Sequence, residues 1–307
     1  MQHVGTVDLR DFEHGGAASR DGFSAELGRS LVDTGFVKVG GHGIAHRAIQ
    51  DAYDAAAEVF ALPEAVKARY ERSDIHGARG FIPFGKERAK DASVTDLKEF
   101  WHIGPHHGGS SVNVWPDEVP AFRPATTALF GALDRAAQTL LTALSVYLGL
   151  APSHLPELVT GADSLLRVLH YPALKGRHQP GAVRAAAHED INFITLLPAA
   201  TDAGLELKTR SGEWMAVDGA DGEIVADSGD MLSRYLNGRI PSTTHRVVNP
   251  DDPDAERYSM PFFCQPRGEV LLAPPPGFVT RGEVVAEPIT AGAFHRERIE
   301  QIRLARS

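Results

Sequence analysis

Short strand-like runs fill the second half of the chain, and this pattern limits the possible folds more than any other sequence feature. Each run is rich in aliphatic, aromatic or β-branched residues and is followed by a turn signal, such as Ser211-Gly212, Ser228-Gly229 or Asn249-Pro250. Eight short strands at this spacing predict a double-stranded β-helix, or jelly roll, in which two sheets pack together. The runs cover residues 165–171, 184–197, 204–207, 214–217, 223–226, 243–248, 257–264 and 270–273.

The first half of the chain carries a helical pattern instead. Phe23, Leu27 and Leu31 recur every four residues and stop at Gly35, which predicts an amphipathic helix that ends at a glycine. The longest apolar stripe predicts a helix over residues 121–148 that packs against the strands. The expected fold class is therefore mainly β with flanking helices, a jelly-roll core and an N-terminal helical region.

We expect the 307 residues to form a single folded unit, because no linker or low-complexity tract divides them. Residues 1–120 would form an N-terminal region. Its segment 77–100 is rich in glycine, proline and charge and suits a substrate-facing arm. Residues 121–160 would supply the long supporting helix, residues 161–280 the jelly-roll core and residues 281–307 a C-terminal helix.

The composition favours a small molecule as the partner. A net charge of −9 and the absence of lysine or arginine runs argue against nucleic acid and anionic membranes. No stretch reaches the roughly 18 apolar residues of a membrane helix, and the N-terminus lacks the pattern of a secretory signal. Cys264 is the single cysteine, so no internal disulfide can form and a cytoplasmic location is expected. The sequence leaves the oligomeric state open.

Two histidines and an aspartate lie in strand-like segments with a spacing that suits a metal site. In a strand, residues i and i+2 share a face, so His188 and Asp190 would point the same way. His245 adds a second imidazole. Two histidines and one carboxylate on one face of a metal leave coordination positions open, which suits non-haem Fe(II) and dioxygen. The alternatives are that Asp190 caps a turn and that His245 is a packed core residue.

Arg257 and Ser259 form a second pair two residues apart, in another strand-like run. Their guanidinium and hydroxyl groups could hold a carboxylate by a two-pronged contact. The alternative for Arg257 is a surface salt bridge to the acidic loop at residues 251–254.

The ordered set His188-x-Asp190, His245-Arg-Val and Arg257-x-Ser259 resembles the isopenicillin N synthase-like family of Fe(II)/2-oxoglutarate-dependent oxygenases. The N-terminal segments 35–44 and 60–70 are similar to the same family. The resemblance covers nearly the whole chain.

This resemblance implies a complete set of site roles. His188, Asp190 and His245 would bind Fe(II), and 2-oxoglutarate would chelate the iron as the cosubstrate of O2. Arg257 and Ser259 would bind its far carboxylate, with Tyr171 assisting. The implied reaction hydroxylates or desaturates a small polar metabolite, as in specialised metabolism, and releases succinate and CO2.

Other outcomes stay open within and outside the family. Many members carry an asparagine where this chain has Leu169. Isopenicillin N synthases, which consume no 2-oxoglutarate, use the arginine, serine and tyrosine to hold their substrate and bring a C-terminal glutamine to the iron. Residues 302–307 contain no glutamine, which favours 2-oxoglutarate use. Ring closure and ethylene formation are further reactions within the family. Outside the enzymes, the alternative is a non-catalytic jelly roll that binds a ligand. The intact triad argues against this alternative.

Arg184 and Arg79 are the candidate residues for binding the prime substrate. Arg184 would share a strand face with His188, and a guanidinium turned toward a barrel interior needs an acceptor. That acceptor could be an internal carboxylate, such as Glu206 or Asp227, or a group on the substrate. Arg79 lies in the arm and could join Arg184 in the second case.

Overall fold

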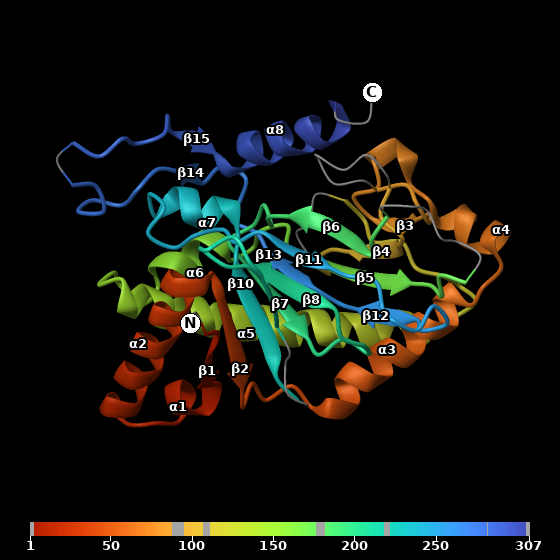
Figure 1. Cartoon of the computed structure of the whole chain (residues 1–307), viewed down its shortest axis with the longest axis horizontal. Helices are drawn as coiled ribbons and strands as arrows, with labels where there is room; N and C mark the ends of the chain where they lie inside the picture. The colour runs from red at the N-terminus through yellow and green to blue at the C-terminus, as the bar shows by residue number, and fades with distance from the viewer. Residues whose placement is uncertain are drawn as a thin grey trace.

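Two β-sheets face each other at the centre of the computed structural model (Figure 1), which describes residues 3–87, 95–106, 111–175, 182–217, 222–280 and 282–304. The larger sheet has the order β1-β2-β10-β7-β13-β5-β4-β3, and β12 also pairs with β5. The smaller sheet has the order β6-β11-β8-β9, and β14 and β15 form a separate pair.

The strand bounds show how short most of these elements are. The larger sheet contains β1 (Gly5–Asp8), β2 (Phe36–Gly40), β3 (Gly80–Ile82), β4 (Glu99–Ile103), β5 (Leu165–Tyr171), β7 (Ile194–Pro198), β10 (Ile224–Ser228), β12 (Arg257–Ser259) and β13 (Phe262–Cys264). The smaller sheet contains β6 (Ala185–His188), β8 (Leu205–Lys208), β9 (Trp214–Ala216) and β11 (His245–Val247), while β14 (Leu271–Leu272) and β15 (Ile289–Thr290) lie apart.

Apolar side chains from both sheets fill the space between them. Phe100 and Tyr171 of the larger sheet pack with Ala185 and Val247 of the smaller one. Phe36 of the larger sheet packs in the same way with Leu205 and Leu207 of the smaller one. This arrangement of two packed sheets confirms the predicted jelly roll.

Helices from the first half of the chain cover the outer face of the larger sheet, and this half is mainly helical, as predicted. Over the whole chain, the described helices are α1 (Leu9–Glu13), α2 (Ala17–Thr34), α3 (His46–Phe60), α4 (Glu64–Lys67), α5 (Phe122–Tyr147), α6 (His154–Val159), α7 (Asp230–Tyr235) and α8 (Ala291–Leu304), with the 3-10 turns η1 (Ala68–Tyr70) and η2 (Ser73–Ile75). The chain leaves α2 at Gly35, whose φ of 73° favours glycine. Leu129 and Leu133 of α5 are fully buried, and Phe130 packs edge-on against Phe262 of β13.

Two of the predicted strand runs are broken in the structure. The run 184–197 divides into β6 and β7 because the chain turns between them. In that turn, the carbonyl oxygens of Asp190 and Phe193 accept hydrogen bonds from the backbone of Asp230 and Gly229. The run 257–264 divides into β12 and β13 next to Pro261, which has no N–H to donate to a neighbouring strand.

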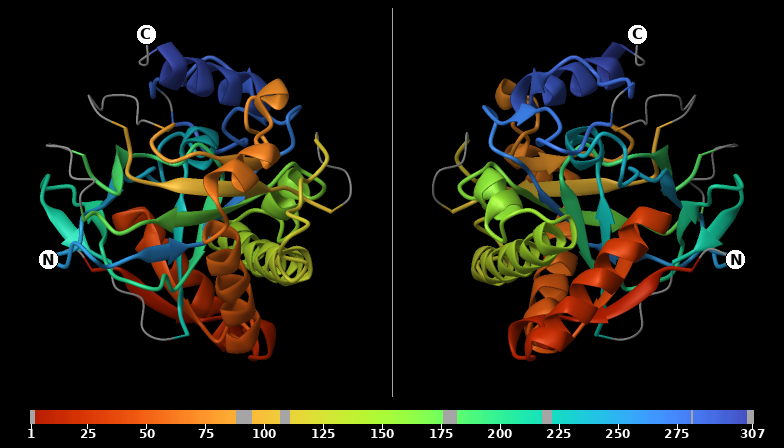
Figure 2. Two further views of the ribbon diagram at one scale, coloured as in Figure 1. Left: turned by 90° about the vertical axis from the view of Figure 1, so that its right-hand side faces the viewer. Right: turned by 90° about the vertical axis from the view of Figure 1, so that its left-hand side faces the viewer.

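Helix α8 lies on the side of the sheets opposite α2, α3 and α5 (Figure 2). It begins after Thr290, whose hydroxyl accepts a hydrogen bond from the backbone of Ala293. Residues 305–307 lie outside the described residues, so the expectation drawn from a tail without glutamine stays a prediction. Among the described helices, none is both long enough and apolar enough to cross a membrane. The division of the chain at residues 120, 160 and 280 also stays a prediction.

Candidate active site

The three residues of the predicted triad come together at one end of the smaller sheet. His188 ends β6 and faces His245 of β11 directly in the register of the two strands. Their ring centroids lie 4.4 Å apart. Asp190 follows in the turn after β6, so the expectation that both residues belong to one strand was wrong for Asp190. The turn nevertheless brings one atom from each residue to within 4.8 Å of the other two.

Hydrogen bonds to the backbone determine which imidazole nitrogens are free. Nδ1 of His188 lies 2.8 Å from the carbonyl oxygen of Ala186, and Nδ1 of His245 lies 3.1 Å from that of Thr243. A carbonyl only accepts, so each Nδ1 donates its N–H, and Nε2 is the ring nitrogen left to face a ligand. Both Nε2 atoms lie 3.9 Å from the same oxygen of Asp190, Oδ1.

The surroundings keep His188 uncharged. Burial, together with the neighbouring His245, lowers the pKa of His188 to about 4. The imidazole is therefore neutral at pH 7, which is the form that binds metal ions. Two imidazoles and one carboxylate oxygen that converge on one point fit Fe(II) and leave other positions for ligands.

Thr195 fixes the orientation of the Asp190 carboxylate. Its hydroxyl donates to Oδ2 of Asp190, and the side-chain amide of Asn192 donates to the same hydroxyl oxygen at 2.8 Å. Both Thr195 and Asn192 are buried. Because Oδ2 is occupied, Oδ1 is the oxygen turned toward the histidines. Thr195 was not predicted from the sequence, although its hydroxyl lies five residues after Asp190 in a predicted strand.

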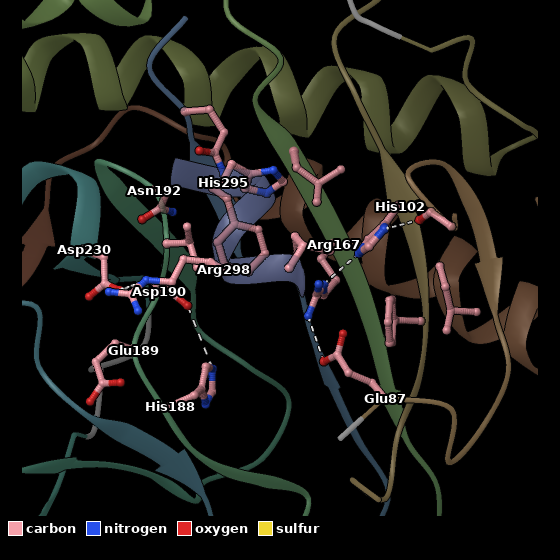
Figure 3. Close-up of a pocket in the computed structure, with 18 of the residues that line it drawn as sticks. Glu87, His102, Arg167, His188, Glu189, Asp190, Asn192, Asp230, His295 and Arg298 are labelled. Carbon is pink, nitrogen blue, oxygen red and sulfur yellow. Dashed lines mark hydrogen bonds and ion pairs between the residues drawn. The ribbon is translucent and has the colours of Figure 1, made fainter. Parts of the chain in front are cut away.

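A cavity of about 1250 Å³ opens beside the triad. Its walls come from the turn 187–192, the strands β4, β5 and β13, and helix α8. Figure 3 shows His188 and Asp190 on one side of this cavity and Arg167 with His102 on the other. The cavity is therefore large enough for a small molecule next to the three converging side chains.

The residues predicted to bind a carboxylate also lie together. In the register of β12 and β5, Arg257 faces Tyr171 and Ser259 faces Leu169. The Arg257 guanidinium lies 5.1 Å from the centre of the Tyr171 ring, and Arg257 and Ser259 are both buried. The surface salt bridge to the acidic loop 251–254 is absent, because Arg257 forms no ion pair with any described residue.

Arg184 joins this group rather than the wall of the cavity. Its side chain is fully buried, and its guanidinium lies 5.9 Å from the centre of the Tyr171 ring. Nη1 contacts the Asp202 carboxylate at 3.1 Å. The partner is neither of the two expected internal carboxylates. Glu206 pairs with Arg246, Asp227 forms no ion pair with Arg184, and the Asp202 side chain that does pair with Arg184 is 37% exposed.

Arg79 does not reach the cavity. Its guanidinium donates to the Asp163 carboxylate and to the carbonyl oxygen of Ala78, and the side chain is 3% exposed. Gly104 permits this position, because a Cβ atom there would lie 2.1 Å from Nη2 of Arg79. The chain therefore turns Arg79 away from the substrate position that the sequence suggested.

A cluster of ionisable residues on the wall of the same cavity was not predicted from the sequence. We call this cluster the charged wall; it comprises Glu87, Asp96, Lys98, His102 and Arg167. Lys98 contacts the carboxylates of Glu87 and Asp96 at 2.8 Å each. The strand pairing of β4 with β5 places His102 opposite Arg167, so residues far apart in sequence meet here.

Comparisons with known proteins agree with this geometry. A family model described as the 2OG-Fe(II) oxygenase superfamily matches residues 162–266. A second, described as the N-terminal region of a non-haem dioxygenase in morphine synthesis, matches residues 4–118. A 2-oxoglutarate-Fe(II) type oxidoreductase of Metarhizium rileyi is 32% identical over 97% of this chain and 91% of its own length. The chain belongs to the 2OG-Fe(II) oxygenase superfamily.

Other relatives of this oxygenase support the assignment. A proline hydroxylase of Petromyces alliaceus is 30% identical and covers 97% of this chain and 99% of its own. A solved 2OG-Fe(II) oxygenase family protein of Caulobacter crescentus has a TM-score of 0.87 and 36% identity over 98% of this chain and 100% of its own. A Neurospora crassa protein solved at full length in complex with alpha-KG has a TM-score of 0.86 and 26% identity over 96% and 95% of the two chains.

The enzyme class and the cofactors predicted from the sequence are thereby confirmed. The oxygenase is a non-haem iron dioxygenase that uses Fe(II), 2-oxoglutarate and O2 on a small-molecule substrate.

Proposed function

We propose that His188, Asp190 and His245 hold Fe(II), and that the oxygenase hydroxylates or desaturates a small polar metabolite with release of succinate and CO2. The observation that carries this proposal is the convergence of the two Nε2 atoms and Oδ1 of Asp190 on one point. Bound iron would activate O2 for the oxidative decarboxylation of 2-oxoglutarate. The protein side chains orient the reactants around it.

We propose further that Arg257, Ser259 and Tyr171 bind the far carboxylate of 2-oxoglutarate. Arg257 is 1% exposed, and its Nη1 has no partner among the described residues. A buried guanidinium without a carboxylate is costly, so an anionic ligand would stabilise it. The Tyr171 ring beside it adds a cation–π contact and limits where the ligand can lie.

Arg184 would act as a positioning residue for this carboxylate site. The Asp202 carboxylate pairs with Arg184, and the Asp202 carbonyl oxygen accepts a hydrogen bond of 3.0 Å from Nε of Arg257. One residue therefore ties the two guanidinium groups together. Arg184 and Arg257 are both buried, and Asp202 is the one carboxylate paired with either of them among the described residues. The site therefore has a net positive charge, which would attract an anion.

The proposal of a small polar substrate rests on the cavity and on relatives. Charged and polar side chains occupy much of the cavity wall. One relative is named for the hydroxylation of proline, a small polar compound. The fungal 2-oxoglutarate-dependent dioxygenases among the relatives are in keeping with a role in specialised metabolism.

The iron assignment is tested by single substitutions. His188→Ala, Asp190→Ala and His245→Ala should each abolish 2-oxoglutarate turnover, because each removes one of three protein ligands. The wild-type protein with Fe(II) and 2-oxoglutarate, without oxygen, should show the weak visible charge-transfer band of the chelate. If saturating 2-oxoglutarate produced no band, a mode without this cosubstrate would replace our proposal.

The carboxylate site is tested with Arg257→Ala. A hydrogen bond to a charged group contributes roughly 1.5–3 kcal/mol, or about one to two decades in affinity. The variant should raise the KM for 2-oxoglutarate by that factor and leave the KM for the prime substrate nearly unchanged. Arg29→Ala, at an exposed pair on α2, is the matched control. Loss of affinity for the prime substrate alone would make Arg257 a substrate anchor instead.

A further inference from the structure

Arg167 projects from β5 toward the cavity, on the same strand face as Tyr171. The two residues are four positions apart, which separates their Cα atoms by about 13 Å. Tyr171 belongs to the proposed carboxylate site for 2-oxoglutarate, and Arg167 lines the cavity beyond it. Arg167 lies across the cavity from His188 and Asp190 (Figure 3), so a molecule bound between them would contact it.

Neighbouring groups fix the Arg167 guanidinium in one position. Nδ1 of His102 lies 2.8 Å from the carbonyl oxygen of Gly77, so this nitrogen carries the proton. Its Nε2 accepts a hydrogen bond of 2.8 Å from Nε of Arg167. Burial and the charge of Arg167 lower the pKa of His102 to about 3, which keeps the imidazole neutral. Phe100 and Phe263 hold the guanidinium at 4.5 Å and 5.4 Å from their ring centres.

Glu87 completes this part of the charged wall. Its Oε1 lies 3.2 Å from Nη1 of Arg167 and 2.8 Å from Nζ of Lys98. Burial would raise the pKa of Glu87, but Arg167 and Lys98 outweigh it and keep the pKa below its ordinary value. Glu87 is therefore ionised. The carboxylates of Glu87 and Asp96 together balance the charges of Lys98 and Arg167.

Two atoms of this wall have no hydrogen-bond partner among the described residues. These atoms are Nη2 of Arg167, a donor, and Oε2 of Glu87, an acceptor. The side chains are 21% and 25% exposed, and both line the cavity. Nη1 of Arg167 and Oε1 of Glu87 are 3.2 Å apart, so the donor Nη2 and the acceptor Oε2 belong to adjacent groups.

We propose that Arg167 and Glu87 bind the prime substrate through a group that presents an acceptor and a donor side by side. The head of an α-amino acid and the edge of a cyclic amide share this chemistry. The charged wall already balances its own charges, so a ligand group with no net charge leaves it balanced. A simple anion would instead face Glu87 without compensation. This inference rests on the proposed function, since it assigns the substrate class of the same cavity.

The experiment compares matched compounds as stimulants of succinate release by the full chain with Fe(II), 2-oxoglutarate, ascorbate and air. The first set contains the common α-amino acids, uracil and 2-pyrrolidinone. The second set removes one half of the pattern, with cyclopentanecarboxylate and pyrrolidine matched to L-proline and cyclopentanone matched to 2-pyrrolidinone. We expect stimulation by members of the first set alone. Stimulation by a compound of the second set, or by none of the first, overturns the inference.

Variants then test the two residues. Arg167→Gln and Glu87→Gln should each raise the KM of the best stimulant at least tenfold and change the KM for 2-oxoglutarate less than twofold. Arg167→Lys keeps the positive charge but loses the planar guanidinium with its paired donors. This variant should also raise the KM of the best stimulant. Arg29→Gln and Glu26→Gln make the same changes at an exposed ion pair and should have no effect. If the KM of the best stimulant were unchanged in Arg167→Gln or in Glu87→Gln, the proposal that these two residues bind the prime substrate together would be refuted.

The anaerobic charge-transfer band separates the two levels of failure. A variant that forms the band with Fe(II) and 2-oxoglutarate is folded and keeps the proposed cosubstrate site. If the wild-type protein forms no band, the proposed function itself fails. If the band forms and only compounds without the paired donor and acceptor stimulate turnover, the proposed function stands and the substrate class is wrong.

Discussion

At the residue scale, one hydroxyl decides which oxygen of Asp190 faces the histidines. Thr195 donates to Oδ2, and Asn192 in turn donates to Thr195. Groups that hydrogen-bond a ligand in this way restrict its orientation, and their loss typically lowers metal affinity about 10–100-fold. Thr195 is therefore a positioning residue for the proposed iron site, although it would not contact iron.

Thr195→Val removes the hydroxyl at nearly constant volume. We expect the affinity for Fe(II) to fall by about one decade, because the carboxylate can then rotate. The measurement is an anaerobic Fe(II) titration, which needs no substrate. Thr139→Val, on the exposed side of α5, serves as the control. An unchanged Fe(II) affinity in Thr195→Val would show that the strand and turn alone orient Asp190.

At the element scale, the contact between α2 and α5 depends on the absence of a side chain. A Cβ atom at Gly28 would lie 2.2 Å from ring atoms of Tyr147, so the two helices approach closely at this point. Gly22, in the same helix, has no atom within 4 Å of the position of a Cβ atom. Substitutions at these two glycines therefore distinguish the effect of helix propensity, at Gly22, from the effect of packing, at Gly28.

Gly22→Ala should stabilise the protein by about 0.5–1 kcal/mol, because alanine loses less backbone entropy in a helix. Gly28→Ala makes the same gain but forces the Tyr147 ring and α5 to move, and overpacking costs about 1–3 kcal/mol. We expect opposite signs in the free energy of unfolding, measured by urea denaturation. Stabilisation in both variants would mean that Tyr147 moves aside at no cost.

At the scale of the whole molecule, the proposed iron site joins the two sheets. His188 and His245 belong to the smaller sheet, whereas Asp190 lies in the turn that leads to β7 of the larger sheet. Thr195 of β7 holds that aspartate. A bound metal would therefore link both layers of the jelly roll, and its binding free energy would add to the stability of the fold.

A metal ion at 100 times its Kd should stabilise the protein by about 2.7 kcal/mol. For a chain of this size this corresponds to an increase in Tm of roughly 5 °C. Differential scanning fluorimetry without oxygen, with and without Fe(II), measures the shift. The variant His245→Ala should lose it. A similar shift in that variant would place the stabilising metal elsewhere.

The sequence alone determined the fold class and the proposed iron triad. Strand runs and turn signals are local patterns, so they can be recognised in the sequence before it is known which strands pair. The triad was found because His188 and Asp190 are two residues apart and because the motif of His245 follows in a family-specific order. The pairing of His188 with His245 across β6 and β11 then brought them together.

Only the tertiary structure decided which charges meet. The register of β4 and β5 brings His102 to Arg167, and the fold brings Asp202 to Arg184 and Asp163 to Arg79. Strand pairing between distant segments depends on packing of the whole molecule, and a shift of one residue would turn every side chain to the other face. Local spacing carries no such information, which is why the partners of the buried arginines and the charged wall could not be predicted.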